Sequence, residues 1–164
     1  ITTMELTIRT GFGYDVHRYA EGRELWLGGI RIDHPIGLSG HSDADVLIHA
    51  LCDALLGAAN LRDIGYHFPD TAGEYKDIDS KLLLARTMQL LDEKGYSFGN
   101  ADCTICAEQP KINPHIPAMQ QKLAEVMQTD PDRISIKATT SEKMGFVGRM
   151  EGMSAYASVL ICKK

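Results

Sequence analysis

The sequence predicts a single-domain α+β sandwich, in which a mixed β-sheet carries helices on one face. The length of 164 residues and the hydrophobic content of 44% suit one globular domain with its own core. Segments with a period of two residues occur near both ends, and helical periods lie between them. The resulting order is strands, helix, helix, strand, helix, strand, strand, which favours one sheet with a helical layer over a doubly wound sheet.

The domain is expected to span residues 4–164. Ile1-Thr-Thr precedes Met4 and resembles an addition to the natural chain, so Met4 is the expected native start. A net charge of -5 argues against a general binder of nucleic acid or anionic membranes. With no long apolar span, no signal peptide and four cysteines expected as reduced thiols, we expect a soluble cytoplasmic protein.

The first strand is expected to open at Met4–Ile8 and to continue into GFGYDVH (11–17). Residues 24–32 have the pattern of a hairpin with Gly28-Gly29 as its turn or a bulge. A loop that contains glycine then leads to the first helix.

That helix is expected within GHSDADVLIHALCDALLG (40–57), where Ser42 or Asp43 can cap its start. Its apolar stripe consists of Val46, Leu47, Ala50, Leu51, Ala54 and Leu55. Asp45, His49 and Asp53 are spaced four residues apart, so they project from one side of the helix. A helix that is otherwise buried seldom carries so many polar groups without using some of them.

Periodicity also predicts the remaining elements. Residues 60–74 form a long polar and aromatic loop, and loops of this length are often functional. The second helix should bury Leu82, Leu83, Arg86, Leu90 and Leu91. The elements are a helix over 80–94, a strand over 96–108, a helix over 116–127, a strand over 134–138, a loop over 139–152 and a strand over 153–162.

Asp15 and His17 lie two residues apart at the expected end of a strand, so their side chains share a face. With a histidine from a facing helix they make a set of two histidines and one carboxylate, which suits a catalytic zinc ion. His49 is a better third ligand than His41, because Asp45 one turn back could orient its imidazole. Spacing alone leaves a metal site and a solvated face equally open.

Other segments carry weaker signals. His41 and Ser42 would stand at the helix N-terminus, which favours a phosphate group, although this segment could serve only as a cap. Lys111 is a cation on a loop made rigid by proline. Thr139–Glu142 offers the hydroxyl and carboxylate oxygens that magnesium with phosphate prefers, and it suits a turn equally well.

Four segments of the chain stand out: GFGYDVH (11–17), GHSDADVLIHALCDALLGAANLRDIGYHFPD (40–70), PKINPHI (110–116) and ATTSEKMGFVGRMEG (138–152). Together they resemble segments of the 2-C-methyl-D-erythritol 2,4-cyclodiphosphate synthase family. The resemblance extends from Met4 onward, with the segments in the same order and at similar gaps. It implies a homotrimer with active sites at its subunit interfaces. It also implies a reaction in which the 2-phosphate of 4-diphosphocytidyl-2-C-methylerythritol 2-phosphate attacks the β-phosphorus and CMP leaves.

The resemblance further implies roles for individual residues. Asp15, His17 and His49 would bind zinc, and Glu142 would hold magnesium or manganese. His41, Thr140 and Asp63 would be catalytic. Phosphate contacts would come from His41, Ser42 and Thr140, while Asp63 and Gly65 would lie near the methylerythritol unit. The residues expected around cytidine are Ala107, Pro110, Lys111, Ile112, Asn113, Ala138 and Thr139, of which Ala107 and Lys111 belong to a different subunit from the zinc ligands.

Phe146, Arg149 and Glu151 match residues that the family places around a central cavity on the threefold axis, where an isoprenoid diphosphate can bind. The chain departs from the family pattern at Ala44 and Met150, where glycine is frequent. Two other functions stay open on the sequence. One is a zinc-dependent phosphohydrolase with Asp63 or Asp45 as general base, and the other is a non-catalytic trimer that binds an isoprenoid diphosphate.

Overall fold

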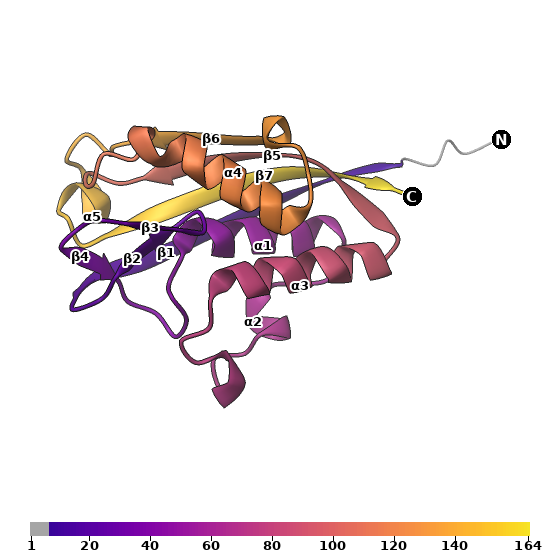
Figure 1. Cartoon of the computed structure of the whole chain (residues 1–164), viewed down its shortest axis with the longest axis horizontal. Coiled ribbons are helices and arrows are strands. Elements are labelled where there is room, and N and C mark those ends of the chain that lie inside the picture. Colours follow the sequence, from indigo (N-terminus) through magenta and orange to yellow (C-terminus); the bar gives the residue numbers. More distant parts are fainter. Residues whose placement is uncertain (1–6) are drawn as a thin grey trace.

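A five-stranded mixed sheet organises the fold, with the strands in the order β4-β1-β7-β5-β6 (Figure 1). Its strands are β1 (Ile8–Glu21), β4 (Ile36–Leu38), β5 (Tyr96–Cys106), β6 (Ile134–Thr139) and β7 (Gly152–Lys163). Strands β5 and β6 run parallel, and the other neighbours are antiparallel. The computed structural model describes residues 7–164, so residues 1–3 and the expected start at Met4 lie outside the described residues.

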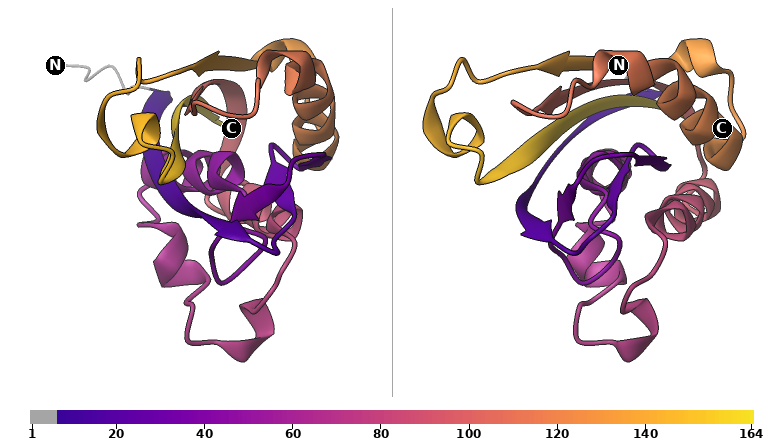
Figure 2. Two further views of the ribbon diagram at one scale, coloured as in Figure 1. Left: turned by 90° about the vertical axis from the view of Figure 1, so that its left-hand side faces the viewer. Right: turned by 60° about the vertical axis from the view of Figure 1, so that its left-hand side comes forward.

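Three long helices cover one face of this sheet, as Figures 1 and 2 show. They are α1 (Val46–Ala58), α3 (Ser80–Glu93) and α4 (Ile116–Met127). Shorter elements complete the fold: the hairpin β2 (Leu25–Leu27) and β3 (Ile30–Ile32), the helices α2 (Ile64–His67) and α5 (Gly145–Gly148), and 3-10 turns at Gly73–Tyr75, Asn113–His115 and Pro131–Arg133. The predicted α+β class, with helices on one face, is confirmed.

The two faces of the sheet differ in burial because side chains alternate along each strand. In β7, alternate residues from Met153 to Ile161 are buried under the helices. The register places Ala157 beside Gly13 of β1 and Cys103 of β5, so all three positions share the helical side. On the opposite side, Phe12 is 67% exposed. The open face therefore carries apolar surface that the described chain leaves uncovered.

Helix α1 lies with its backbone directly against β1. A Cβ atom on Gly11 would stand 1.9 Å from the Ala54 carbonyl oxygen, and one on Gly13 would stand 1.9 Å from the Ala50 carbonyl oxygen. Such distances exclude any side chain, so only glycine permits this approach. None of the described helices has the length and apolar character to cross a membrane.

Several element boundaries differ from the predictions. Helix α1 is capped by Asp45, whose side chain accepts a hydrogen bond from the Ile48 amide, and not by Ser42 or Asp43. Ala44, just before this cap, has a left-handed φ of 60°, which breaks the helical path. Strand β1 continues to Glu21, so Asp15 and His17 lie within the strand and not at its end.

Two further differences have simple physical causes. Leu82 and Arg86 were expected in the buried stripe of the second helix, yet Leu82 is 60% exposed and Arg86 is also exposed. Leu84 and Thr87 are buried instead, on a helix that packs mainly against α1 and also against α4 and β5. Two short elements lie in segments that were expected to be loops. They are β4, a strand of only three residues, and α2, a helix of a single turn.

Candidate active site

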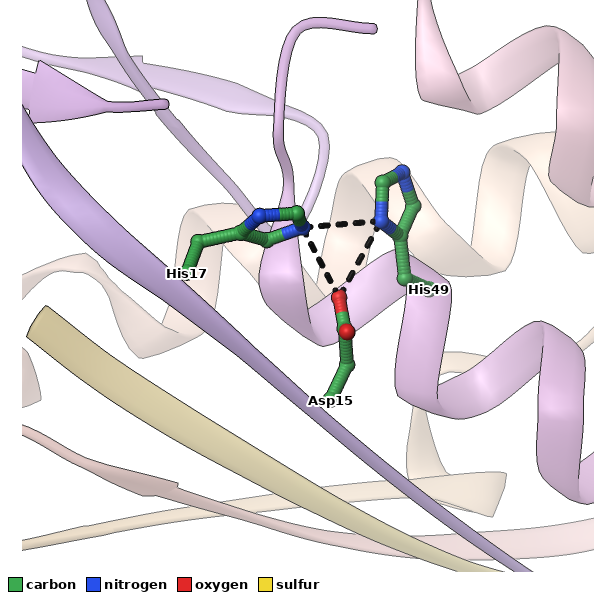
Figure 3. A group of neighbouring side chains, drawn as sticks. All are labelled: Asp15, His17 and His49. Carbon is green, nitrogen blue, oxygen red and sulfur yellow. Dashed lines mark hydrogen bonds and ion pairs between the residues drawn. The ribbon is translucent and has the colours of Figure 1, made fainter. Parts of the chain in front are cut away.

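Asp15, His17 and His49 bring three donor atoms together between β1 and α1, as Figure 3 shows. The Asp15 Oδ2 atom lies 2.9 Å from His17 Nε2 and 3.1 Å from His49 Nδ1. The two histidine nitrogens are 3.1 Å apart. We call this group the Asp15–His17–His49 cluster. The strand supplies two ligands two residues apart on one face, and the helix that rests on the two glycines supplies the third.

The cluster fits a divalent metal ion. His17 Nδ1 lies 2.9 Å from the Ser39 carbonyl oxygen, which can only accept a hydrogen bond, so Nδ1 carries the proton and Nε2 directs a lone pair inward. A tetrahedral ion with ligands at about 2.0–2.1 Å would hold its ligand atoms roughly 3.3 Å apart. The observed separations are close to that spacing, so little movement would be needed to bind an ion.

Electrostatics also favour a charged carboxylate in the cluster. Burial alone would raise the pKa of Asp15, but hydrogen bonds and charges from His17 and His49 outweigh it and lower the pKa to about 2. Burial would likewise lower the pKa of His49, yet its hydrogen bond to Asp15 and the charge of that carboxylate raise it. Asp15 is therefore ionised at neutral pH and available as a metal ligand.

The prediction that Asp45 orients the His49 imidazole is wrong. Asp45 is fully buried, and its carboxylate accepts hydrogen bonds from the backbone amides of Gly28 at 2.9 Å, Gly29 at 2.7 Å and Ile48 at 3.1 Å. Burial and then the charge of Asp43 raise its pKa, against these hydrogen bonds. Asp45 thus joins the β2–β3 turn to the start of α1, and other groups contact His49.

A cavity of about 260 Å³ opens beside the cluster and is lined in part by His41, Ser42 and Gly65. His41 and Ser42 were expected at the helix N-terminus, but they lie in the loop ahead of the Asp45 cap. The His41 Nε2 atom is buried and has no hydrogen-bond partner among residues 7–164. His41 therefore lines the cavity and also carries a buried ring nitrogen without a partner in this part of the chain, and the helix dipole does not account for its place.

The long loop forms another wall of this cavity through Gly65, Phe68 and Asp70. Asp63 is exposed at the N-cap position of α2 and makes no side-chain capping bond. The carboxylate of Asp53 accepts a hydrogen bond of 2.7 Å from the Ile64 amide and so holds the loop against α1. Sequence reasoning missed Phe68, Asp70 and this use of Asp53, because the local pattern does not show which loop residues return to the helix.

A second cavity, of about 500 Å³, collects the residues expected around cytidine. Its lining includes Ala107, Pro110, Lys111, Ile112, Asn113, Ala138, Thr139 and Thr140. The side chain of Ile112 is buried in the core. Among the described residues, the two cavities have no lining residue in common. One chain thus presents two separate groups of candidate site residues.

Comparison with known proteins identifies the family. The model of the YgbB family matches residues 8–162, which is nearly the whole described chain. The chain belongs to the YgbB family.

Relatives of this YgbB chain carry a consistent name. A protein of Parabacteroides distasonis named 2-C-methyl-D-erythritol 2,4-cyclodiphosphate synthase is 71% identical over 95% of this chain and 97% of its own. The solved structure of the IspF–CDP complex of Plasmodium falciparum has a TM-score of 0.85 and 32% identity, and the match covers 98% of this chain and 99% of that one. The resemblance inferred from the four sequence segments is confirmed.

The bifunctional IspDF of Campylobacter jejuni gives a TM-score of 0.94 with 43% identity. That match covers 98% of this YgbB chain but only 43% of the bifunctional chain. The YgbB fold therefore also occurs as one part of a longer protein.

Within the YgbB chain, Glu142 lies near the second cavity, since Thr140 Oγ1 donates a hydrogen bond of 3.3 Å to Glu142 Oε1. Glu108 fixes this segment, because its carboxylate accepts from the backbone amides of Ser141 at 3.0 Å and Lys143 at 3.2 Å. Glu142 and Lys143 both have positive φ angles, of 53° and 62°. No sequence signal pointed to Glu108. It follows the end of β5 and holds the turn around Glu142 through these hydrogen bonds.

Phe146 and Arg149 line neither of these two cavities. Phe146 lies on α5 and is exposed, and Arg149 forms an ion pair of 2.8 Å with Glu151. The residues expected around a central cavity are therefore not among those that line either candidate cavity.

Proposed function

We propose that this protein converts 4-diphosphocytidyl-2-C-methyl-D-erythritol 2-phosphate into 2-C-methyl-D-erythritol 2,4-cyclodiphosphate and CMP, a step of non-mevalonate isoprenoid biosynthesis. The observation that carries the proposal is the 71% identity with the Parabacteroides distasonis synthase over 95% of the chain. The geometry agrees with it, since a metal cluster and a separate loop cavity suit the two ends of a nucleoside diphosphate substrate.

In this reaction an oxygen of the 2-phosphate attacks the β-phosphorus. The bond from the β-phosphorus to the oxygen that bridges it to the α-phosphorus breaks, and the electron pair leaves with CMP. The nucleophile belongs to the substrate, so the protein need not form a covalent intermediate. Its task is to hold the two phosphates in line and to neutralise the charge that develops.

The donor atoms indicate which ions would assist. The two nitrogens and one carboxylate oxygen of the Asp15–His17–His49 cluster suit Zn²⁺, and the Glu142 carboxylate suits Mg²⁺ or Mn²⁺. Bound there, such ions would supply positive charge to the phosphate oxygens. The Zn²⁺ assignment is supported by His17, whose remaining ring nitrogen is occupied by the Ser39 carbonyl oxygen.

Side chains around the two cavities would bind the rest of the substrate. His41 Nε2 is available to a phosphate oxygen because it lacks a partner among the described residues, and Ser42 lies beside it. Thr140 would contact phosphate in the second cavity, and Asp63 with Gly65 would contact the methylerythritol unit. Lys111 and its neighbours Ala107, Pro110, Ile112, Asn113, Ala138 and Thr139 would hold cytidine, with Ile112 acting through its backbone because its side chain is buried.

The protein would act as a homotrimer in which the metal half of one subunit meets the cytidine half of the next. Two observations support this assembly: the half-sites do not share a cavity, and the open sheet face exposes Phe12, Tyr14 and Tyr156. Exposed apolar patches of this kind commonly mark an interface. A cavity on the threefold axis, near Phe146 and Arg149, would accept an isoprenoid diphosphate.

Four free cysteines suit a reducing cytoplasm.

A zinc hydrolase would need a general base beside the metal. Asp45 cannot serve, because its carboxylate is fully buried and already accepts three backbone hydrogen bonds. The structure thus removes one of the two bases that such an enzyme could use.

Phosphorus NMR of the protein with the diphosphocytidyl substrate and Mg²⁺, before and after chelation and zinc restoration, tests the proposal. We expect CMP and a cyclic diphosphate, lost on chelation and restored by Zn²⁺. CMP with an open-chain bisphosphate would instead identify a hydrolase. Lack of turnover by a trimer loaded with both ions would overturn the enzymatic proposal and favour the non-catalytic binding of an isoprenoid diphosphate.

A further inference from the structure

The hydroxyl group of Ser80 lies between His49 and Asp43. Ser80 is the first residue of α3 and is fully buried. Its Oγ atom is 2.9 Å from His49 Nε2, and it donates a short hydrogen bond to Asp43 Oδ1. The Ser80 backbone amide also donates to Asp43 Oδ2 at 2.9 Å. Asp43 therefore accepts hydrogen bonds from both the hydroxyl and the backbone amide of Ser80.

The chemistry of these groups fixes the direction of the hydrogen bonds. An ionised carboxylate can only accept, so the single hydroxyl proton of Ser80 points to Asp43. The Ser80 oxygen is then an acceptor toward His49, which must carry its proton on Nε2. This leaves His49 Nδ1, which lies 3.1 Å from Asp15 Oδ2, as the nitrogen that would give up its proton and direct a lone pair to a metal ion.

Ser42 is the other hydroxyl near His49, with its Oγ 3.1 Å from Nε2. It accepts a hydrogen bond from the Ala44 amide and lines the cavity, where a substrate group could compete for it. Ser80 is held from behind by a carboxylate and does not line that cavity, so its contact with His49 is the one that substrate binding would leave unchanged.

We propose that Ser80, held by Asp43, is a positioning residue that fixes the tautomer and ring orientation of His49 for metal binding. The inference rests on the metal site of the proposed function. Both histidines of the cluster then have their outward nitrogen fixed by an acceptor, His17 by the Ser39 carbonyl oxygen and His49 by Ser80.

The test compares Ser80→Ala with Thr87→Val, which removes another fully buried hydroxyl of α3. Zinc affinity is measured by competition with a chromophoric chelator, and the His49 tautomer by long-range proton–nitrogen NMR of the metal-free protein. We expect Ser80→Ala to weaken zinc binding about 10- to 100-fold and to populate the Nδ1–H tautomer, as loss of a ligand's outer partner does. Thr87→Val should leave both readouts unchanged.

Asp43→Asn gives a second test if Ser80→Ala does not fold. Its amide still accepts from Ser80 but lacks the charge that fixes the hydroxyl, so we expect a smaller loss of zinc affinity and a mixture of tautomers. Wild-type zinc affinity and tautomer in a folded variant would overturn the inference. Because neither readout needs turnover, this outcome is distinct from failure of the proposed function, which would appear as an inactive wild-type protein loaded with zinc.

Discussion

Ala44 adopts a backbone conformation that L-amino acids rarely tolerate. Its φ of 60° lies in the left-handed region, and the residue is fully buried at the point where the chain turns into α1. Glycine, which is frequent at this position in the family that the sequence resembles, would adopt this φ without steric cost. The left-handed Met150, with a φ of 61°, is the other position where the sequence departs from a frequent glycine.

We therefore expect Ala44→Gly to raise the free energy of unfolding by about 1 kcal/mol, the cost of a left-handed alanine relieved by glycine. Urea unfolding followed by circular dichroism measures this change. Ala85→Gly, at an exposed helical position in α3, is the matched control and should lower stability by about 1 kcal/mol. A loss of stability in Ala44→Gly would show that the backbone strain is not relieved by glycine.

Tyr19 should make the stability of the folded protein depend on pH at high pH. Its hydroxyl donates a 2.5 Å hydrogen bond to the Gln109 carbonyl oxygen, beside the second cavity. Burial and then the charge of Glu108 raise the pKa of Tyr19 to about 12 in the folded chain, from about 10 in the unfolded chain. Folding therefore favours the neutral phenol. The stabilising contribution is therefore complete below pH 10 and is lost as pH rises from about 10 to about 12.

Urea unfolding of the wild type and Tyr19→Phe at pH 8 and pH 11 isolates this contribution. We expect the wild type to lose more stability between these values than the variant, because the variant has no phenol to ionise at this site. An equal loss in both proteins would mean that Tyr19 ionises as freely in the folded chain as in the unfolded one.

At the scale of single elements, Glu108 joins the end of β5 to the turn that carries Glu142. Glu108→Ala removes the acceptor for two backbone amides in a turn with two left-handed residues. We expect the Mg²⁺ concentration for half-maximal activity to rise about 10-fold, as for the loss of a group that orients a metal ligand. Glu108→Gln keeps one oxygen acceptor and should show a smaller rise.

Zinc content provides the internal control for these variants, because Glu108 lines the second cavity and the Asp15–His17–His49 cluster lies at the first. It should stay at the wild-type level in both. If Mg²⁺ dependence also stays unchanged in Glu108→Ala, the turn holds Glu142 without this clamp.

The long elements could be predicted from periodicity because their buried faces repeat over several turns or alternations. The third helix was predicted with the bounds that α4 has, Ile116–Met127. The start of α1 could not be fixed in the same way, since Ser42, Asp43 and Asp45 are all residues that cap helices well. Strand β4 has too few residues to show any alternation.

The candidate site was predictable to the extent that its residues are spaced by one regular element. Asp15 and His17 share a face wherever they stand on a strand, so the strand spacing alone brought them together. The hydroxyl that contacts His49 comes from Ser80, which is brought to it by the packing of α3 on α1. Local sequence patterns do not record such tertiary pairings.

At the scale of the whole molecule, the separation of the two cavities gives a test of the trimer. On the proposed function, His49→Ala should disable the metal half of the site and Lys111→Ala should weaken its cytidine half. If each active site combines halves from two subunits, random mixed trimers made from equal amounts of the two variants should regain about a quarter of wild-type activity. Each such site needs the metal half of one variant and the cytidine half of the other.

The two variants are unfolded, mixed and refolded together, and activity is compared with that of the separately refolded parents combined afterwards. Sedimentation should give a particle of about three times the 18.1 kDa chain in each case. Activity no higher than that of the combined parents would show that each subunit holds a complete site.

The close packing of α1 against β1 also limits how the length of the segment from 11 to 17 can change. Gly11, Gly13, Asp15 and His17 are four successive inward positions of one strand, the first two touching the helix backbone and the last two facing His49. Insertion or deletion of one residue after Gly13 would keep the helix seated but turn both ligands to the open face. The segment from 11 to 17 can therefore change in length only by two residues at a time, and even such a change would displace the ligands by about 7 Å along α1.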